Sequence, residues 1–511
     1  EGIDGTPVVA KEISFDIGDR LLLNDVSFSL GPRTLAAIVG PSGAGKSTLL
    51  GVLTGRTKPT SGQIFIGGID LHTQFQSLSR QIGSVPQADI LHTRLTVRQA
   101  LNYGAQLRLP NDTTKAERDA RVADVMEKLE LTERADLRID RLSGGQRKRA
   151  SIGLELLTSP QLLVLDEPTS ALDPIAAEEV LSILHRLVHD LGLTVVIAEH
   201  KLERVIQFAD RIVYINGDGA ANVGTPEEIL MQSPIAPPIV HLARALGMTE
   251  IGTTVREMRR MTADIRELKS SNVVEPSVKR TETVITFEKL TVSYDNKTAL
   301  NSVSSTIFAG EIVAVMGRNG AGKSSLLKAI AGVNRPHAGK VSLLGTDPFE
   351  LHGKKRREKI GFIPQEPSDL LYGQSVKIEC EQADRDNELA EGTTHQVLQQ
   401  LVPGISLSTH PRDLSEGQRL GLALSVVLSS NPAVLILDEP TRGLDYEAKN
   451  ELTRMLIHFA STFDKAVLLA THDVELVAEL ASRVVFIADG DIVADGSTLD
   501  VLLSSPAFAP Q

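Results

Sequence analysis

Two stretches of this chain combine glycines, a lysine and hydroxyls in the order that a phosphate-binding loop requires. Both fit the pattern G-x-x-x-x-G-K-[ST], and each follows an apolar run and precedes an apolar helical pattern. In such a loop, backbone N–H groups surround the phosphates of a nucleotide, the lysine adds a positive charge, and the first hydroxyl can bind Mg²⁺. The predicted nucleotide-binding residues are Gly40, Ser42, Gly43, Gly45, Lys46, Ser47 and Thr48 in the first stretch and Gly317, Asn319, Gly320, Gly322, Lys323, Ser324 and Ser325 in the second.

Carboxylates that could activate water follow short apolar runs in both halves of the chain. Asp166-Glu167 and Asp438-Glu439 each end such a run, 23 residues after a Ser-x-Gly-Gln element. Because a protein catalyses phosphoryl transfer mainly by positioning groups and stabilising charge, we predict that the aspartates hold Mg²⁺ and the glutamates polarise the attacking water. A solvated strand end is the alternative, and the equal spacing in both halves disfavours it.

Glutamine and histidine residues complete the predicted catalytic sets. Gln87 and Gln365 follow their phosphate-loop lysines by 41 and 42 residues, each after a proline, and can reach Mg²⁺ and the water from a loop. His200 and His472 lie 34 residues after the aspartates, just past a β-pattern, where they can hydrogen-bond the γ-phosphate. A lone histidine would more often be structural, but two at equal spacing are predicted to be catalytic.

The elements that must position these residues recur as an internal repeat. Lys46 and Lys323 are separated by 277 positions, and from Leu142 onward matching residues are separated by 272. We therefore predict two homologous units, residues 5–242 and 283–511, each with one nucleotide site. The stretch 243–282 is mixed in charge and has a helical pattern over Thr254–Lys269, and we interpret it as a linker that acts as a tether.

Short apolar runs predict the strands that carry the carboxylates and histidines. The runs are bounded and lack polar residues apart from one threonine, as is typical of central parallel strands. Because strands alternate with helical patterns in both units, we predict the α/β fold class with a P-loop core in each. The predicted strands are Leu162–Leu165, Thr194–Ala198, Val434–Leu437 and Ala466–Ala470.

The composition argues against several other kinds of protein. The 511 residues are 41% apolar and 23% charged, which is ordinary for globular domains. A net charge of −12 argues against bulk binding to nucleic acid, and we interpret the basic run Lys354–Arg357 as a solvated face. The single Cys380 excludes a disulfide framework, an iron–sulfur domain and a cysteine-based zinc site within the chain, and we expect a half-exposed bystander thiol.

The sequence has no pattern typical of a transmembrane helix. Leu420–Leu437 carries no charge, but Ser429–Pro432 interrupts it, which predicts a helix, a turn and a buried strand. No signal-peptide pattern is present, so we expect a cytosolic chain that reaches the cytoplasmic face of the membrane through a partner. Because Glu1 stands where a methionine would, we expect a fragment or a processed chain.

A fifth element identifies the family that the chain resembles. Leu142–Gln146 reads Leu-Ser-Gly-Gly-Gln, and Leu414–Gln418 repeats it as Leu-Ser-Glu-Gly-Gln. Together with the phosphate loops, glutamines, carboxylates and histidines, this element makes both units resemble the ATP-binding cassette family over nearly the whole chain outside the linker. The resemblance implies two tandem nucleotide-binding domains, each with a RecA-like core, an antiparallel β subdomain and an α-helical subdomain that carries the signature.

In that family the signature of one cassette caps ATP that is held by the other. The resemblance therefore implies that Lys46 and Glu167 act with Ser415, Gly417 and Gln418. It also implies that Lys323 and Glu439 act with Ser143, Gly145 and Gln146. The serine begins a helix, so backbone N–H groups and the helix dipole can face the γ-phosphate.

Other positions carry over from the family with a departure in one signature. Phe15 and Tyr294 stand where the family places an aromatic ring under adenine, although a strand aromatic is often simply core. Glu416 replaces the usual glycine, and a carboxylate turned toward the γ-phosphate at 4 Å would cost roughly 4 kcal/mol at an effective dielectric near 20. We expect Glu416 to point outward and both sites to stay active. The Mg²⁺ ligands implied are Ser47, Gln87 and Asp166 in the first unit and Ser324, Gln365 and Asp438 in the second.

Longer matches point to two branches of the family. Segments of unit two and the later part of unit one look like the fused double ATPase of energy-coupling factor (ECF) importers, in which a membrane T component and a small S component take up a vitamin or metal ion. The front of unit one looks more like G-type exporters, which leaves an exporter ATPase as the alternative. The ECF-like segments are Asp173–Glu179, Glu199–Glu203, His410–Arg419, Asp438–Asp445, Ala470–Asp473 and Ser505–Gln511; the exporter-like ones are Asp89–His92, Leu95–Arg98 and Leu142–Leu157.

Soluble tandem cassettes that act on ribosomes are a further alternative. They usually carry a long, basic, helical linker, whereas 243–283 is short and mixed in charge. We therefore expect membrane transport subunits rather than nucleic acid as partners, and ATP and Mg²⁺ as cofactors.

Overall fold

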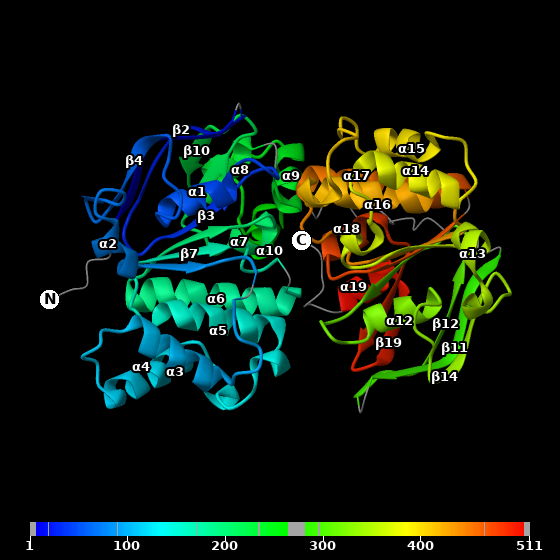
Figure 1. Ribbon diagram of the computed structural model, residues 1–511, viewed down its shortest axis with the longest axis horizontal. Coiled ribbons are helices and arrows are strands. Elements are labelled where there is room, and N and C mark those ends of the chain that lie inside the picture. The colour runs from blue at the N-terminus through cyan, green and yellow to red at the C-terminus, as the bar shows by residue number, and fades with distance from the viewer. Residues whose placement is uncertain are drawn as a thin grey trace. The chain divides into compact units, whose positions relative to one another are not determined.

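The computed structural model describes residues 7–18, 20–88, 90–170, 172–233, 236–263, 282–294, 297–463 and 465–504. The chain divides into two compact units, residues 1–270 (unit 1) and 271–510 (unit 2), which run from blue to green and from green to red in Figure 1. Part of the predicted linker is helical, since α9 (Pro238–Ala245) enters it and α10 (Val255–Met261) lies within it. The rest of the helical pattern, 264–269, lies outside the described residues.

The central sheet of unit 1 is mostly parallel. Its described strands are β3 (Leu35–Val39), β6 (Ile82–Val85), β7 (Leu162–Asp166), β8 (Thr194–Ala198), β9 (Arg211–Ile215) and β10 (Ala221–Gly224). They run in the order β10-β9-β3-β8-β7-β6, with only β10 antiparallel to its neighbour among the described pairs. Strands β3 and β8 are buried throughout, which is why they are continuous apolar runs.

A second, antiparallel sheet and a set of helices complete unit 1. The sheet has the order β2-β1-β4-β5, with β1 (Val8–Ile17), β2 (Arg20–Leu30), β4 (Ser61–Ile66) and β5 (Ile69–Asp70). The described helices include α1 (Lys46–Leu53), α2 (Phe75–Leu78), α3 (Val97–Arg108), α4 (Lys115–Lys128), α5 (Gly144–Leu156), α6 (Pro174–Leu191), α7 (Leu202–Val205) and α8 (Pro226–Gln232). Helix α5 lies between α6 and the pair α3 and α4 (Figure 1).

Unit 2 repeats both sheets. Its antiparallel sheet has the order β12-β11-β14, and its mostly parallel sheet has the order β15-β16-β17-β13-β18-β19 within the described residues. The bounds are β11 (Thr283–Tyr294), β12 (Lys297–Phe308), β13 (Ile312–Met316), β14 (Ala338–Leu343), β15 (Ile360–Ile363), β16 (Val434–Asp438), β17 (Ala466–Ala470), β18 (Arg483–Ala488) and β19 (Asp491–Ser497).

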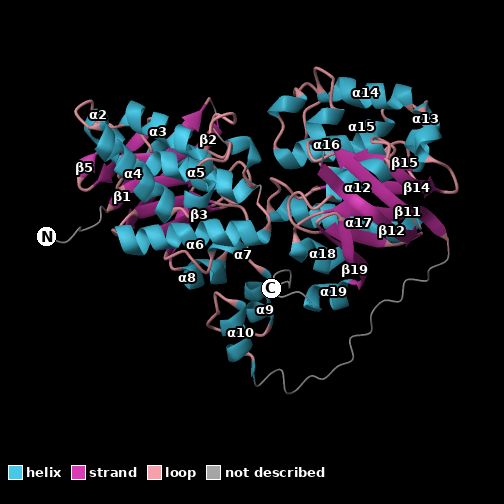
Figure 2. Cartoon of the chain, turned by 90° about the horizontal axis from the view of Figure 1, so that it is seen from below, coloured by secondary structure: helices cyan, strands magenta, loops and turns pink. Residues whose placement is uncertain are grey.

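The helices of unit 2 also match those of unit 1. They are α12 (Lys323–Ile330), α13 (Gly353–Lys359), α14 (Val376–Asp386), α15 (Thr393–Leu401), α16 (Glu416–Leu428), α17 (Tyr446–Phe463), α18 (Val474–Leu480) and α19 (Thr498–Ser504). Helices α14 and α15 pack with α16 at one end of unit 2 (Figure 2). The predicted RecA-like core, antiparallel β subdomain and α-helical subdomain are therefore confirmed in both units.

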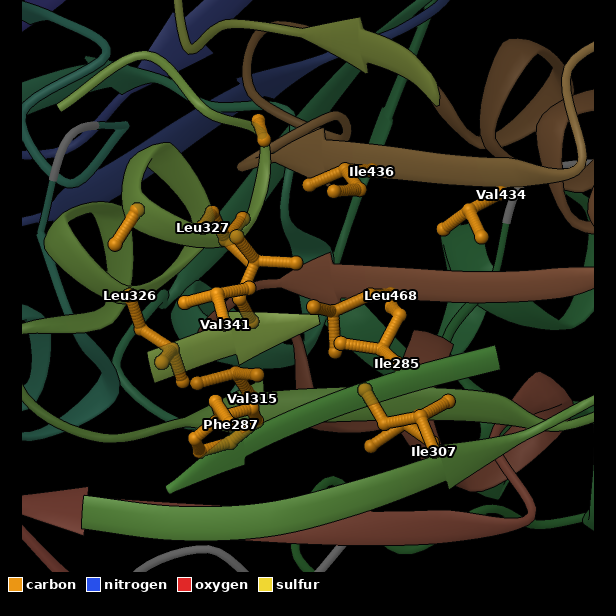
Figure 3. Close-up of a cluster of buried hydrophobic side chains, with 14 of the residues drawn as sticks. Ile285, Phe287, Ile307, Val315, Leu326, Leu327, Val341, Val434, Ile436 and Leu468 are labelled. Carbon is orange, nitrogen blue, oxygen red and sulfur yellow. The ribbon is translucent and has the colours of Figure 1, made fainter. Parts of the chain in front are cut away.

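Helix α12 is held between the two sheets of unit 2 by apolar side chains. Leu326 and Leu327 of α12 meet buried residues of both sheets (Figure 3). Because α12 begins at Lys323, this core fixes the start of the helix and hence the phosphate loop before it. The sheet residues labelled in the cluster are Ile285, Phe287, Ile307, Val315, Val341, Val434, Ile436 and Leu468.

The four predicted strands and the helix–turn–strand interpretation of Leu420–Leu437 are confirmed by β7, β8, β16, β17 and the end of α16. The expectation for Cys380 is wrong, because its side chain is buried on α14 beside Val376 and Leu398. Burial, reinforced by three nearby carboxylates, raises the pKa of the thiol to about 11. No helix in the described ranges has the length and apolar character of a membrane span.

Candidate active site

The first phosphate loop joins β3 to α1 through a left-handed backbone that requires glycine. Gly45 has φ of 94°, and a Cβ placed there would stand 2.7 Å from the carbonyl oxygen of Leu22. The loop wraps around its own lysine, since Lys46 Nζ donates to the carbonyl oxygens of Gly40 at 2.9 Å and Pro41 at 2.8 Å. The first turn of α1 therefore starts at a preformed anion-binding loop with a buried ammonium group.

A hydroxyl and a carboxylate meet beside this loop. Ser47 Oγ donates to Asp166 Oδ1 at 3.3 Å, which joins the start of α1 to the end of β7. Burial raises the pKa of Asp166, the Ser47 bond lowers it and the neighbouring Glu167 raises it, so that the net pKa is raised. Ser47 and Asp166 form a hard oxygen pair of the kind that Mg²⁺ prefers.

Glu167 is the centre of a second group of contacts. His200 Nε2 lies 2.6 Å from Glu167 Oε1, and Gln87 Nε2 donates to Glu167 Oε2 at 2.8 Å. Burial raises the pKa of Glu167, but the bond from His200, the charges of His200 and Lys46, and the bond from Gln87 lower it below its usual value. The carboxylate therefore stays ionised, as a group that polarises water must.

Unit 2 assembles the same chemistry. Lys323 Nζ donates to the carbonyl oxygen of Gly317 at 2.8 Å, and Ser324 Oγ donates to Asp438 Oδ1 at 3.0 Å. Burial raises the pKa of Asp438. The structure thus brings each predicted lysine, hydroxyl and aspartate together within its own unit.

The second glutamate differs from the first in its partners. Glu439 Oε2 lies 2.7 Å from His472 Nδ1, and Glu439 Oε1 lies 3.7 Å from Lys323 Nζ. In unit 1 the corresponding histidine presents Nε2, and a glutamine adds a bond to the glutamate. Gln365 follows β15, at the place that matches Gln87, and its role stays a prediction.

The two signatures begin helices, as predicted. Ser143 caps α5 by accepting from the backbone N–H of Gln146 at 3.2 Å, and the Gln146 side chain accepts from the N–H of Ser143 at 3.0 Å. Ser415 and Gln418 form the same capping box on α16. Gly145 and Gly417 let these helices approach α6 and α17 closely, because a Cβ at either would stand 3.2 or 3.3 Å from an alanine methyl group.

Glu416, the departure in the second signature, is compensated locally. Its Oε1 pairs with Arg419 Nη1 at 3.0 Å one turn along α16, and its side chain is half exposed. The two predicted adenine-stacking aromatics differ in exposure. Phe15 packs against the core of unit 1, and Tyr294 is 45% exposed with its hydroxyl accepting from Asn334 at 3.0 Å.

Comparison with known proteins decides the family. A family model described as "ABC transporter" matches residues 23–170 and 300–442, one stretch in each unit. This chain belongs to the ABC transporter ATP-binding family. Units 1 and 2 are therefore its two ATP-binding cassettes, and ATP hydrolysis is their activity.

Two relatives match along nearly the whole chain. A Streptomyces coelicolor protein named as an ABC transporter ATP-binding protein is 42% identical, over 98% of this chain and 95% of its own length. A Methanosarcina acetivorans protein of the same description is 32% identical over 98% and 88%. Among solved structures, that of an RNase-L inhibitor covers 98% of this chain and 95% of its own, with a TM-score of 0.62 and 20% identity, which supports the tandem fold alone.

Three charged residues of cassette 1 near the site were missed by sequence reasoning. Lys148 is buried on α5 and donates to the carbonyl oxygen of Gln87 at 3.1 Å, so it ties the glutamine loop to the signature helix. Glu199 is buried directly after β8, and Arg204 reaches back to the turn after Glu167. Cassette 2 has Leu420, Thr471 and Leu476 at these three positions, and this difference within the repeat is the signal that could have found them.

Proposed function

We propose that this protein is the ATP-hydrolysing subunit of a membrane transporter, of the energy-coupling factor type that takes up a vitamin or a metal ion. The observation that carries the proposal is that each cassette gathers a phosphate loop, an Asp-Glu pair and a histidine, and also presents a capped signature helix. Tandem transport ATPases need these parts, and the relatives named as ABC transporter ATP-binding proteins support the transporter part of this proposal. The energy-coupling factor type rests on the sequence segments that resemble that branch.

In the proposed reaction, two ATP molecules bind in composite sites. Lys46 and the N–H groups of its loop hold the phosphates of one ATP, which Ser415 and Gly417 of the other cassette cap. Lys323 and its loop hold the second ATP, which Ser143 and Gly145 cap. The cassettes close around ATP and reopen after hydrolysis. ATP can drive a change in the membrane partner only because it binds the closed state more tightly than the open state.

The residues around each phosphate loop fit Mg²⁺ as well as ATP. Ser47 with Asp166, and Ser324 with Asp438, place a hydroxyl and a buried carboxylate side by side, and these are hard oxygen donors. When bound, Mg²⁺ would neutralise charge on the β- and γ-phosphates. Gln87 and Gln365 are the further ligands that we propose.

Glu167 and Glu439 polarise the attacking water in this mechanism. Each glutamate is held by a histidine at 2.6 or 2.7 Å, so the carboxylate is oriented before the nucleotide arrives. The water attacks the γ-phosphorus as the bond to the β–γ bridging oxygen breaks, and ADP and phosphate leave. The lysine ammonium groups offset the negative charge that develops on the bridging oxygen.

The partner surface that we propose follows the glutamine loop in each cassette. Ile90, Tyr103 and Leu107 leave 56%, 52% and 86% of their surfaces exposed in cassette 1, and Tyr372 and Ile378 leave 84% and 42% in cassette 2. Exposed large apolar side chains in these positions suit an apolar helix of a membrane subunit.

Nucleic acid is not part of the proposal. The basic run on α13 is used within the cassette, where Lys354 pairs with Glu388 at 2.7 Å and Arg356 donates to the carbonyl oxygen of Ala331 at 2.8 Å. Groups engaged in this way are less available for phosphate contacts on a nucleic acid.

Two experiments test the proposal at different levels. We expect Glu167→Gln and Glu439→Gln each to lower Mg-dependent ATPase turnover and the double variant to trap ATP with turnover near zero; full turnover in the double variant would refute the site. Affinity capture from detergent-solubilised membranes should recover a polytopic T-type subunit with small S-type proteins. Recovery of ribosomal proteins, or of a large exporter subunit, would overturn the importer assignment and leave the ATP chemistry intact.

A further inference from the structure

A buried glutamate side chain accepts a hydrogen bond from the turn between β7 and α6. This β7–α6 turn starts after Glu167 and includes Thr169 and Leu172. The backbone N–H of Thr169 donates to Glu199 Oε1 at 2.9 Å. Glu199 is 2% exposed and follows β8 directly, so its carboxylate lies under the turn rather than in solvent. A buried backbone N–H that found no acceptor here would destabilise the observed turn.

Arg204 holds the same turn through its carbonyl groups. Its Nη1 donates to the carbonyl oxygen of Thr169 at 2.9 Å and to that of Leu172 at 3.3 Å. Glu199 and Arg204 both belong to the segment 199–204, which also carries His200. The segment 199–204 therefore bonds to one backbone N–H and two backbone carbonyls of the turn. It also contacts Glu167 through His200.

Glu167 has a backbone conformation that depends on its surroundings. Its φ is 42°, in the left-handed region that residues other than glycine rarely adopt. Such conformations persist only where neighbouring structure holds them. The carbonyl oxygen of Glu167 accepts from the N–H of Ser170 at 3.3 Å, so the position of the turn fixes the backbone that aims the glutamate.

Cassette 2 holds its matching turn with different charges. Positions 471 and 476, which match Glu199 and Arg204, are a threonine and a leucine and have no carboxylate or guanidinium group. Instead, Arg442 in the turn pairs with Glu366 of the glutamine loop at 2.7 Å. Lys449 on α17 pairs with Asp473, next to the histidine, at 2.8 Å. Cassette 1 has serine, alanine, alanine and lysine at the four positions that match these residues.

We propose that Glu199 and Arg204 are positioning residues specific to cassette 1, which lock the β7–α6 turn to the His200 segment and so keep Glu167 aimed for hydrolysis. Movement of His200 is thereby transmitted to the turn, whereas in cassette 2 the turn is tied to the glutamine loop. This inference rests on the proposed role of Glu167. The side-chain hydrogen bonds of both residues go to the turn, so we expect their loss to affect turnover more than ATP binding.

The test compares kcat with the KM for ATP in variants of a full chain that carries Glu439→Gln, so that turnover by cassette 2 does not mask a loss in cassette 1. This Glu439→Gln chain is the original chain of each comparison. Glu199→Ala is expected to lower kcat about tenfold, a typical effect of leaving one buried donor unpaired, and to change the KM by no more than about twofold. Glu199→Gln should keep kcat within about twofold of the original chain, because the amide oxygen can still accept from Thr169. Arg186→Met, which removes an exposed guanidinium group from α6, is the matched charge control.

Double variants separate positioning from general damage to the fold. Glu199→Ala combined with Arg204→Met should lower kcat little further than the stronger single change, because both hold one turn. A merely structural role would instead reduce the number of ATP molecules bound per chain and leave kcat per occupied site unchanged. That result, or a kcat for Glu199→Gln as low as that for Glu199→Ala, would overturn the inference.

Glu167→Gln distinguishes this inference from the proposed function. If Glu167→Gln lowers turnover and Glu199→Ala does not, the positioning role fails while the catalytic assignment stands. If Glu167→Gln leaves turnover unchanged, the assignment of Glu167 fails and the inference fails with it.

Discussion

Gly443 and Glu416 offer a sharp test of how the second signature tolerates its carboxylate. Gly443 lies in the turn after Glu439 with φ of 72°, and a Cβ placed there would stand 3.0 Å from Glu416 Cγ. Cassette 1 has Ala171 and Gly144 at the matching positions, so the large and small residues are exchanged between the repeats. We predict that Gly443→Ala destabilises cassette 2 and that Glu416→Gly partly rescues it.

The magnitude follows from two separable costs. A left-handed alanine costs about 1–2 kcal/mol, against a gain of about 0.4–1 kcal/mol from the restricted unfolded chain. The half-exposed Glu416 can turn away from a new methyl group only by leaving Arg419, and an exposed pair of this kind is worth at most about 1 kcal/mol. We therefore expect Gly443→Ala to destabilise by about 1–2 kcal/mol, of which up to about 1 kcal/mol depends on Glu416.

Differential scanning calorimetry of the full chain measures this prediction. For a domain of this size the loss corresponds to about 2–8 °C in the transition of cassette 2. Gly404→Ala is the matched control, because Gly404 has φ of 85° in open space, and the variant therefore measures the backbone cost without a contact. If Gly443→Ala lowers the transition temperature equally in the original chain and in the Glu416→Gly chain, the proposed contact is refuted.

The remaining predictions concern metal, pH and thiol reactivity. Ser47→Ala and Ser324→Ala should each raise the Mg²⁺ concentration needed for half-maximal ATPase activity by roughly tenfold, because each removes a hydroxyl ligand. A Mg²⁺ titration of ATPase activity checks this. An unchanged titration would show that the serines are not Mg²⁺ ligands. Burial raises the pKa of Glu199 above its ordinary 4.5, so the folded chain binds the Glu199 proton more tightly than the unfolded chain does. Protonation of Glu199 therefore stabilises the fold at low pH, and this stabilisation is lost as pH rises through the raised pKa. Melting curves should therefore show Glu199→Gln gaining stability over the original chain as pH rises above the ordinary pKa of 4.5. A difference that stays constant across that rise would contradict the raised pKa. Cys380, with a buried thiol of pKa about 11, should resist alkylation at about pH 8 in the folded chain and react fully in urea; rapid alkylation of the folded chain would contradict its burial.

Much of the fold was predictable from the sequence because it depends on local patterns. The apolar run Leu162–Leu165 could only be a buried strand or a short helix segment, and its repeat at Val434–Leu437 before a second Asp-Glu pair favoured the strand. The lysines and hydroxyls were predictable for a similar reason, since the phosphate loop fixes its own conformation within nine residues. The starts of α5 and α16 were also predictable, because each begins at a serine, Ser143 or Ser415, that forms a capping box.

Other parts could not be predicted, because they depend on contacts between distant segments. The burial of Cys380 follows from the packing of α14 against α15 and α16, which no local pattern specifies. Glu199 looked like a charged residue at a strand end and gave no sign that it accepts a bond from Thr169, thirty positions earlier. Lys148 likewise stood in a basic run, although its ammonium group is buried against the glutamine loop.

The two cassettes share the residues that phosphate chemistry requires. They differ in the side chains that contact the catalytic glutamate and the turn after it. In cassette 1 the glutamate has a glutamine and a histidine as partners, and the turn after it is tied to the histidine segment. In cassette 2 the lysine and histidine flank the glutamate, and the turn is tied to the glutamine loop. Because a site responds to its neighbour through such connections, equal catalytic residues need not give equal responses to ATP or to a partner. If the cassettes differ in rate, these residues are therefore the first positions to exchange between them.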